Sequence, residues 1–196
     1  MSYQFVRKPL ENGSYEPEGI YLDCPFDKEA RLVQTWGTFP EFYRQYSYNG
    51  VALNGYLGLG FDVTWPTSIQ AVDSGRVSEI GFEPTGFERY IKIDHWWGES
   101  LYARISSVQI ESGQVVERKA SLALAGQSKG QLPQRFHFGI RIRPFNRFDG
   151  WGGFSDPMPY LNPTVLGNTI VMPDTAAIDQ YQPLPMAVEG QNSRRA

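Results

Sequence analysis

The stretch Arg135–Arg143, R-F-H-F-G-I-R-I-R, combines one of the chain's two histidines with three arginines. Its alternation predicts a β-strand with an apolar face for the core and a second, cationic face that carries His137. The apolar side chains are Phe136, Phe138, Ile140 and Ile142, and the opposite side has Arg135, His137, Gly139, Arg141 and Arg143. Imidazole can bind a metal or transfer a proton, whereas guanidinium stays charged and only donates hydrogen bonds. We therefore expect the cationic face to lie toward water or a functional cleft.

The other residues that could bind a metal are sparse. His95 lies in I-D-H-W-W-G, where we expect a partly exposed, hydrogen-bonded side chain, with a metal role as the minor alternative. Cys24 is the only cysteine, which excludes an internal disulfide and a cysteine-rich metal site. We expect Cys24 to be a small, half-buried residue.

The elements that must position these residues are mostly strands. The 196 residues suffice for one domain with arms, and 20 glycines and 14 prolines separate short aromatic and β-branched runs. We predict an all-β fold with one short helix, an antiparallel sandwich or barrel of eight to ten strands. The expected strands are Tyr3–Val6, Ile20–Cys24, Arg31–Trp36, Gly60–Thr64, Ser68–Val72, Arg76–Phe82, Arg89–Trp96, Ser100–Ile105, Leu122–Ala125 and Arg135–Arg143.

Two connections carry specific predictions. The segment T-F-P-E-F-Y-R-Q-Y is expected to form the helix, with Thr38 as its cap and Pro40 and Glu41 in its first turn. The sequence D-S-G after Val72 predicts a tight hairpin between the two strands that flank it.

Charge and hydropathy limit the partners. The formal net charge is −3, from 18 basic and 21 acidic residues, which argues against a general nucleic-acid-binding protein. The N-terminus lacks the apolar run of a signal peptide, and no segment is long and apolar enough to span a bilayer. We expect a protein that is made in the cytoplasm and does not insert into membranes.

Several spacings in order resemble the lysostaphin-type (LytM-like) zinc endopeptidases, from about Arg31 to Leu161. The family's H-x-G-x-D, followed by a proline and V-x-A-x-x-x-G-x-V, is similar to G-L-G-F-D-V-T-W-P-T-S-I-Q-A-V-D-S-G-R-V at Gly58–Val77. I-x-H-x-x-G and Y-A-H-L are similar to the segment Tyr90–Ile105, and V-x-x-G-Q-x-V to Val108–Val116. The glycine turn Ala125–Gly130 precedes R-F-H-F, which lies where the family has H-x-H-F.

The resemblance implies a fold that cleaves peptide cross-bridges of peptidoglycan with a zinc ion held by His, Asp and His, assisted by two further histidines. On this chain the three ligand positions fall on Gly58, Asp62 and His137, and the two assisting positions fall on Arg104 and Arg135. Glycine has no ligand atom, and arginine cannot act as a base or as a zinc ligand. We therefore expect no zinc and no other cofactor, with the arginines supplying the positive charge and giving Asp62 a charged partner.

Aromatic residues at two turns are candidates for contacts outside the domain. Trp96 and Trp97 lie at a predicted hairpin tip, and Trp151 lies in a glycine-rich loop, G-W-G-G. Such side chains are hard to bury, so a contact surface for a glycan, peptide or protein and simple packing remain as alternatives.

These expectations combine into three functional hypotheses. We divide the chain into an N-terminal arm or added strand (1–30), a LytM-like domain (31–162) and an extended C-terminal arm (163–196). The leading hypothesis is a catalytically inactive domain serving as an oligomeric structural or binding subunit of a phage particle, tail or similar assembly. The first alternative is a regulatory pseudoenzyme that binds peptidoglycan or a protein. The second is an active zinc endopeptidase with an unusual ligand set.

Overall fold

The computed structural model describes residues 8–9, 15–16, 19–84, 86–125, 135–162, 169–172 and 183. The predicted mostly-β fold with one short α-helix is confirmed. The elements are β1 (Lys8–Pro9), β2 (Tyr15–Glu16), β3 (Ala30–Gln34), α1 (Pro40–Tyr43), β4 (Ser47–Tyr48), β5 (Val51–Ala52), β6 (Leu59–Asp62), β7 (Ser68–Gln70), β8 (Gly75–Glu83), β9 (Glu88–Asp94), β10 (Gly98–Ala103), β11 (Ile105–Val108), β12 (Val115–Val116), β13 (Ser121–Ala125), β14 (Arg135–Ile142), the 3₁₀ helix η1 (Met158–Tyr160) and β15 (Ile170–Val171).

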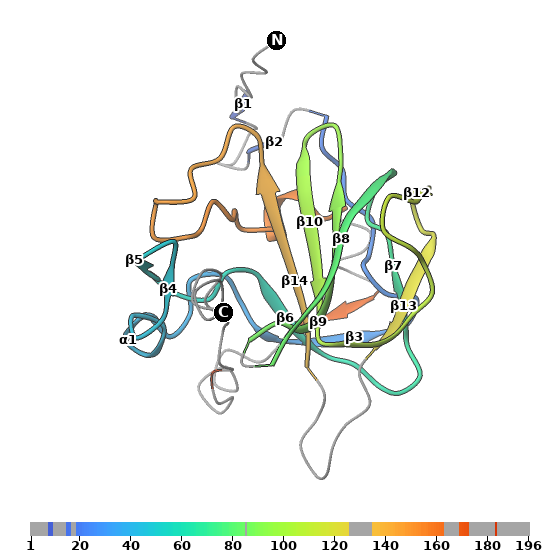
Figure 1. Ribbon diagram of the computed structural model, residues 1–196, viewed down its shortest axis with the longest axis horizontal. Coiled ribbons are helices and arrows are strands. Elements are labelled where there is room, and N and C mark those ends of the chain that lie inside the picture. Colours follow the sequence, from blue (N-terminus) through green and yellow to red (C-terminus); the bar gives the residue numbers. More distant parts are fainter. Residues whose placement is uncertain are drawn as a thin grey trace, which may run out of the picture.

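An eight-stranded sheet dominates the molecule, in the order β12-β8-β9-β10-β14-β6-β3-β15. Its pairs are antiparallel except for β15, which runs parallel to β3. Figure 1 shows β14 as a long central strand beside β10, with the three-stranded sheet β11-β13-β7 to the right. The predicted pairing of Arg89–Trp96 with Ser100–Ile105 is confirmed by β9 and β10, which pair from Asp94–Glu99 to Tyr90–Ala103.

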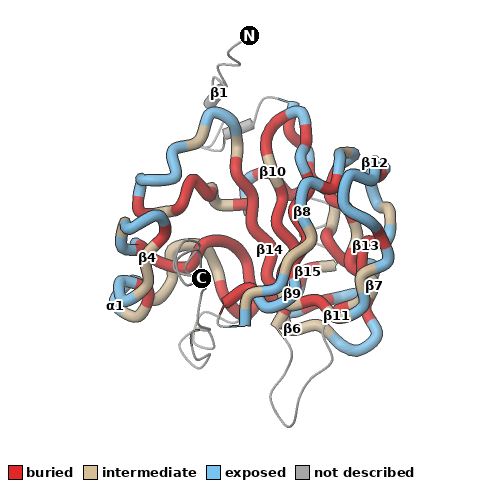
Figure 2. The backbone as a smooth tube through the Cα atoms, viewed as in Figure 1, coloured by how far each residue is buried: buried red, intermediate tan, exposed pale blue. Residues whose placement is uncertain are grey.

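The main core lies between the two sheets. Phe136, Phe138 and Ile140 of β14 are fully buried there, together with Ile69 of β7 and Leu122 of β13. The alternation of β14 therefore predicted its apolar face correctly, and Figure 2 shows the strand buried along most of its length.

The opposite face of β14 does not face water as a cationic strip. His137 is 2% exposed and Arg141 0%, because a second cluster of aromatic residues covers this side. Arg141 donates to Glu99 (2.7 Å), to the hydroxyl of Tyr48 (2.5 Å) and to the Gly152 carbonyl (3.0 Å). Burial of this cation is tolerated because each part of its guanidinium has a partner. Of the five positions, only Arg143 is exposed.

The D-S-G segment is a corner between sheets, and the predicted hairpin is wrong. β7 pairs with β13, whereas β8 pairs with β9 and β12. Gly75 is needed there for close approach, because a Cβ atom on it would lie 2.5 Å from the Asp94 carbonyl oxygen. A local turn signal could not reveal that the two strands diverge.

The helix lies where it was predicted, but its cap differs. Pro40 and Glu41 occupy the first turn, as expected. The N-cap residue is Phe39 in the left-handed region (φ 54°), and no side chain caps the helix. Thr38 is engaged elsewhere, because its hydroxyl donates to the Thr35 carbonyl (2.8 Å).

The segments that flank the central domain are partly integrated into it. In place of the predicted strand Ile20–Cys24, Leu22 forms a single bridge to Leu161, and both residues belong to the main core. β15 extends the large sheet, and apart from residues 169–172 and 183 the expected C-terminal arm lies outside the described residues, as do Tyr3–Val6.

In the part of the chain that the structure describes, no helix has the length and apolar character needed to cross a membrane.

Candidate functional site

Strands β6 and β14 bring the sequence-predicted residues together. Their antiparallel register places Arg135 opposite Asp62 and His137 opposite Gly60. On the other side of β14, His137 lies opposite Ala103 of β10, the residue before Arg104. The positions that the resemblance assigned to zinc ligands and assisting histidines therefore converge. We call these five positions, Gly58, Asp62, Arg104, Arg135 and His137, together with Tyr56, which contacts His137, the vestigial site.

The backbone at Gly58 excludes any side chain. A Cβ atom built there would collide with the Phe138 carbonyl oxygen and lie 2.9 Å from His137 Cε1. Because the obstacle includes a backbone atom of a central strand, a rotamer change could not relieve it. The sequence therefore lacks the first ligand histidine at this position, and the neighbouring backbone also leaves no room for a side chain there.

Tyr56 is the partner of His137. Its hydroxyl lies 2.6 Å from His137 Nδ1, and the two rings are in edge contact with centroids 5.1 Å apart. Phe87 covers the imidazole with a ring-centroid distance of 5.2 Å. Burial, together with the nearby charge of Arg104, lowers the pKa of His137 to about 3, so the imidazole is neutral near neutral pH. The His137 Nδ1 position that could bind a metal is therefore occupied by a hydrogen bond.

Asp62 has the charged partner that the sequence predicted, but at long range. Arg135 Nε lies 3.8 Å from Asp62 Oδ1, and no hydrogen bond reaches this oxygen among the described residues. Burial raises the pKa of Asp62, and the charges of Arg135 and Arg31 oppose this shift without cancelling it. An ion pair would be expected to lower the pKa, so the direction indicates that the contact is too long to offset desolvation.

Arg104 enters the vestigial site from the junction of β10 and β11. Its backbone is left-handed (φ 63°), an uncommon conformation for a side chain of this size. Its backbone N–H donates to the Phe87 carbonyl (3.0 Å) and its guanidinium to the Gly86 carbonyl (3.1 Å). Burial raises the pKa of Tyr56, and the charges of Arg104 and Arg135 both oppose this shift, so the two cations lie near the same hydroxyl.

The residues present do not fit a zinc ion. Gly58 admits no ligand, His137 Nδ1 is paired with Tyr56, and two guanidinium groups would repel a dication. Within the described residues, no three His, Cys, Asp or Glu side chains gather in a way that could hold a metal.

Two buried polar atoms of the vestigial site have no hydrogen-bond partner among the described residues. Within the described chain, four buried side-chain atoms lack a hydrogen bond: Gln34 Oε1, Asp62 Oδ1, Glu83 Oε2 and His137 Nε2. Asp62 lies on β6, and Gln34 and His137 are both opposite Gly60 of that strand. Unpaired buried polar atoms are rare and costly, so these positions are candidates for contact with a ligand or an ordered water.

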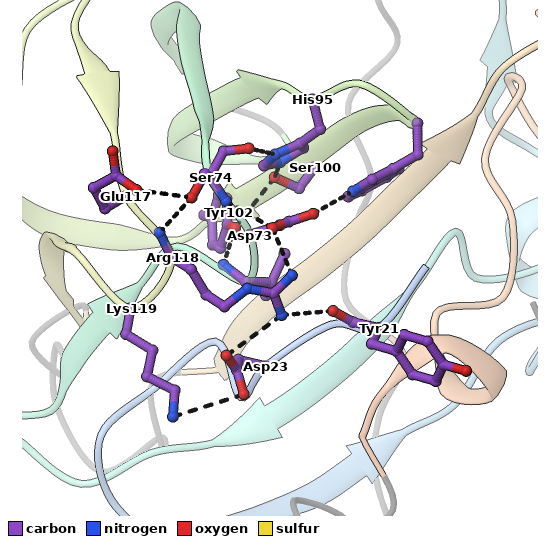
Figure 3. A network of polar contacts seen from close by, with 12 residues as sticks. Tyr21, Asp23, Asp73, Ser74, His95, Ser100, Tyr102, Glu117, Arg118 and Lys119 are labelled. Carbon is purple, nitrogen blue, oxygen red and sulfur yellow. Dashed lines mark hydrogen bonds and ion pairs between the residues drawn. The ribbon is translucent and has the colours of Figure 1, made fainter. Parts of the chain in front are cut away.

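His95 belongs to a separate, well-paired cluster that Figure 3 shows. The side chain is 4% exposed, so the expectation of partial exposure is wrong, while the expected hydrogen bonding is confirmed. Nδ1 lies 2.9 Å from the Ser74 carbonyl and Nε2 lies 2.7 Å from Ser100 Oγ. A carbonyl only accepts, so Nδ1 carries the proton and donates it. Burial lowers the pKa of His95.

The same cluster connects three segments through one carboxylate. Asp73 accepts from Arg118 (2.6 Å) and from the indole N–H of Trp97 (3.0 Å). Arg118 also donates to the Tyr21 carbonyl (2.7 Å) and pairs with Asp23, which ties the N-terminal segment to the domain (Figure 3). We call this cluster the Asp73 network.

The three tryptophans proposed as contacts have different environments. Trp97 is fully buried and stacks on His95 (4.6 Å between centroids), so it cannot be part of a contact surface. Trp96 is 54% exposed. Trp151 is half-buried and stacks on Trp36, with ring centroids 4.6 Å apart. Trp96 and Trp151 remain candidate contacts.

Comparison with solved structures defines the class of this fold. The chain is similar to the peptidase lysostaphin from Staphylococcus simulans (17% identity, 69% of this chain and 52% of that chain, TM-score 0.51). It is also similar to Csd3 of Helicobacter pylori (18%, 82% and 40%, TM-score 0.54) and to a zinc-containing peptidase from Vibrio cholerae (16%, 78% and 45%, TM-score 0.52). At these identities the likeness establishes the fold, and the chain spans about half the length of these structures or less. No curated protein matches the sequence.

Residues 55–148 match the model of peptidase family M23. The chain therefore contains a domain of the peptidase M23 type, which confirms the resemblance inferred from its motifs.

Sequence reasoning missed Tyr56. Tyr56, Gly58, Gly60 and Asp62 alternate in sequence, so they share one side of an extended segment that includes β6. Because Tyr56 lies outside the family motif, only this alternation could have identified it as the partner of His137.

Proposed function

We propose that this protein is a catalytically inactive LytM-like domain that serves as a structural or binding subunit. The observation that carries the proposal is the closed backbone at Gly58, next to a His137 imidazole that is engaged by Tyr56. Hydrolysis in this fold requires an open metal position for an activated water. Arg104 and Arg135 can neither accept a proton nor bind a metal.

Activity and metal content test this proposal directly. The protein is purified in the presence of zinc, its metal content is measured, and it is incubated with purified peptidoglycan sacculi. We expect substoichiometric zinc that does not change in an Asp62→Ala variant, and no release of soluble fragments. Stoichiometric zinc that is lost in Asp62→Ala, or release of wall peptides, would overturn the proposal in favour of an active zinc endopeptidase.

We further propose that the subunit is part of a phage particle, tail or similar assembly. Two strands outside the family match support a structural role in an assembly, because β3 and β15 extend the sheet beyond residues 55–148. Large apolar side chains such as Phe82 (65% exposed) and Phe148 (64%) are available for contacts. The reuse of an enzyme fold as a building block is an analogy at the level of fold.

Sedimentation velocity over a range of concentrations tests assembly. We expect self-association, or co-sedimentation with neighbouring shell or tail proteins when these are co-expressed. A monomer at all concentrations that binds no co-expressed neighbour would contradict the assembly role.

The alternative is a regulatory pseudoenzyme that binds peptidoglycan or a protein. The retained polar atoms of the vestigial site favour it, because a purely structural domain gains nothing from leaving them unpaired. Pull-down on purified sacculi separates the two roles, since a purely structural subunit would not be retained.

A further inference from the structure

We propose that the exposed edge of β8, residues Ser78–Glu83, binds an extended, antiparallel strand of a partner protein, in which a basic side chain lies between two apolar ones. This edge is separate from the vestigial site, so the proposal goes beyond the inactive domain and identifies an interaction surface for the subunit. Its basis is an uncovered strand edge that combines an exposed aromatic side chain with two acidic groups.

The edge begins where β12 stops covering β8. β12 pairs only with the first two residues of β8, and the last backbone bonds on this side in the described chain join Val77 to Gln114 and Gly113 (2.8 Å each). A β-bulge follows between Val77 and Glu79. Among the described strands, only β9 lies beside Ser78–Glu83, and Figure 2 shows this part of β8 as exposed or intermediate. An exposed edge presents backbone N–H and C=O groups with which a further strand can pair.

One face of this edge is apolar and continues the main core outward. Ile80 packs against the main core, and Phe82, two residues further on the same face, is 65% exposed. The cation on this face, Arg89, lies opposite Phe82 on the β9 side, away from an incoming strand. Proteins usually protect a strand edge with charged side chains or proline. An exposed phenylalanine does the opposite, because it favours association.

The other face of the edge is acidic. Glu79 accepts from the Tyr90 hydroxyl (2.5 Å) and from Lys92 (2.8 Å). Glu83 lies on the same face, and its Oε2 is buried without a hydrogen-bond partner among the described residues. Burial raises the pKa of Glu83, the charge of Lys92 opposes this shift, and the charge of Glu79 adds to it. A further cation beside Glu83 would therefore stabilise its ionised form.

The spacing of these side chains defines the sequence pattern of the partner. In an antiparallel pair, directly opposite side chains are closest, and diagonal ones remain within reach when they are long. A lysine or arginine opposite Gly81 lies on the acidic face, diagonal to both Glu79 and Glu83. The residues before and after it then lie opposite Ile80 and Phe82 on the apolar face. The expected motif is therefore apolar–basic–apolar.

A second copy of this edge fits less well than a basic strand. The segment Ser78–Glu83, S-E-I-G-F-E, has no basic residue, so an antiparallel pair of two copies would bring the two glutamates of each copy onto one face. Like charges opposite one another destabilise a strand pair. The edge is instead complementary in charge to a basic segment of a different protein.

Binding of short strands to the full chain tests the proposal. The probes are the acetylated and amidated peptides T-T-V-K-V-T-T and T-T-V-E-V-T-T, and the lysine peptide with methylated backbone nitrogens. Binding is followed by the NMR amide signals and hydrogen-exchange rates of Ser78–Glu83. We expect the lysine peptide to shift these signals, to slow exchange at this edge, and to bind about 10-fold more tightly than the glutamate peptide. The methylated peptide should not bind.

Three outcomes of this titration would overturn the proposal. The first is the absence of any shift at the β8 edge at millimolar lysine peptide. The second is equal binding of the lysine and glutamate peptides, which would mean that the acidic face does not select the partner. The third is equal binding of the methylated peptide, which would mean that the backbone of the edge does not pair with the ligand.

Matched variants assign the binding to this edge. Phe82→Ser and Glu83→Gln should each weaken binding of the lysine peptide about 3-fold or more. Phe148→Ser removes an equally exposed phenylalanine (64%), and Glu29→Gln removes an exposed carboxylate next to β3, on the far side of the sheet. Both controls should leave binding unchanged, and equal losses in the controls would refute the assignment. Unchanged amide signals away from the substituted residue verify that each variant is folded.

Two further results separate this proposal from other roles of the chain. Concentration-dependent broadening of the edge signals without peptide, abolished by Phe82→Ser, would assign the edge to a second copy and overturn the partner strand. Release of wall peptides in the hydrolase assay would remove the inactive domain but leave binding at the edge intact. Conversely, failure of the peptides to bind would leave the inactive domain in place.

Discussion

The vestigial site and the Asp73 network are two buried polar clusters that differ in how completely their atoms are paired. In the Asp73 network, both carboxylate oxygens of Asp73 and both ring nitrogens of His95 have partners. In the vestigial site, Asp62 Oδ1 and His137 Nε2 have none among the described residues. Complete pairing favours stability, so the Asp73 network contributes to the fold through every one of these atoms, whereas the vestigial site contributes through only part of its polar atoms.

The two histidines make the contrast specific. Each is a buried neutral imidazole with an aromatic neighbour, Trp97 for His95 and Phe87 for His137. Both ring nitrogens of His95 are hydrogen-bonded, one to a carbonyl and one to a hydroxyl. Only one ring nitrogen of His137 has a partner among the described residues. The comparison teaches that residue type alone does not reveal how a buried histidine is paired, since two neutral imidazoles of one fold differ in this respect.

The largest effect is expected from Gly58→Ala. The new methyl group would meet the Phe138 carbonyl oxygen in a central strand, and separating β6 from β14 should cost about 3 kcal/mol or more in the free energy of unfolding. Gly60→Ala on the same strand is the control, because its Cβ would lie 3.1 Å from Gln34 Cβ and the Tyr56 hydroxyl, a contact that a shift of a few tenths of an ångström relieves. Urea denaturation measures both, and equal losses would show that the backbone at Gly58 is not closed.

A slightly smaller loss is expected from Asp73→Ala in the other cluster. It removes the acceptor of Arg118 and Trp97 and leaves a buried indole N–H unpaired, at a cost of about 2–3 kcal/mol. Asp27→Ala is the control, since this exposed carboxylate accepts only from the Ser68 backbone N–H in the described contacts and should cost below about 1 kcal/mol. Equal, small losses for both variants would mean that the Asp73 network contributes little to stability.

Local patterns predicted the fold class and much of the vestigial site. The alternation in Arg135–Arg143 indicated the buried face of β14, and the motif order placed Gly58, Asp62, Arg104, Arg135 and His137 at one site, where the register of β6, β14 and β10 brings them. These inferences succeeded because they depend on strand periodicity and on the order of motifs.

The parts that failed depend on contacts between distant segments. Burial of Arg141 and Trp97 requires partners, Glu99 and Asp73, that lie 42 and 24 residues away. The D-S-G segment forms a corner because β7 and β8, on either side of it, pair with different strands. Thr38 does not cap α1 because its hydroxyl donates to the Thr35 carbonyl. No short window of sequence contains this information.

Acidification should weaken both clusters through their histidines. The folded-state pKa of His137 is lowered to about 3 and that of His95 is also lowered, so the unfolded chain binds protons first, near its ordinary pKa of about 6.5. Stability is therefore complete above about pH 7 and is lost as the pH falls below about 6.5, down to about pH 3 for His137. Between pH 7 and 5.5 the loss from His137 should be roughly 1 kcal/mol, and His95 adds to it in the same direction.

Urea denaturation against pH measures this loss, and the ring signals of the only two histidines report each group separately. The raised pKa of Asp62 acts in the opposite sense, because its carboxyl group binds a proton more readily in the folded chain than in the unfolded chain. A His137 ring that titrates near pH 6.5 in the folded protein would contradict its burial beside Arg104.

The smallest effect, and the most direct comparison, comes from two fully buried tyrosines. Tyr102→Phe in the Asp73 network removes the acceptor of the Val72 backbone N–H (2.9 Å) and the partner of Ser100 Oγ (3.1 Å), and should cost about 2 kcal/mol. Tyr56→Phe removes one bond, to His137 Nδ1, and should cost about 1 kcal/mol because one hydrogen bond is lost in place of two. The two changes delete the same atom from the same residue type, so urea denaturation compares the surroundings alone. A larger loss for Tyr56→Phe would mean that the vestigial site is the better-paired cluster, and the distinction drawn between the two regions would be reversed.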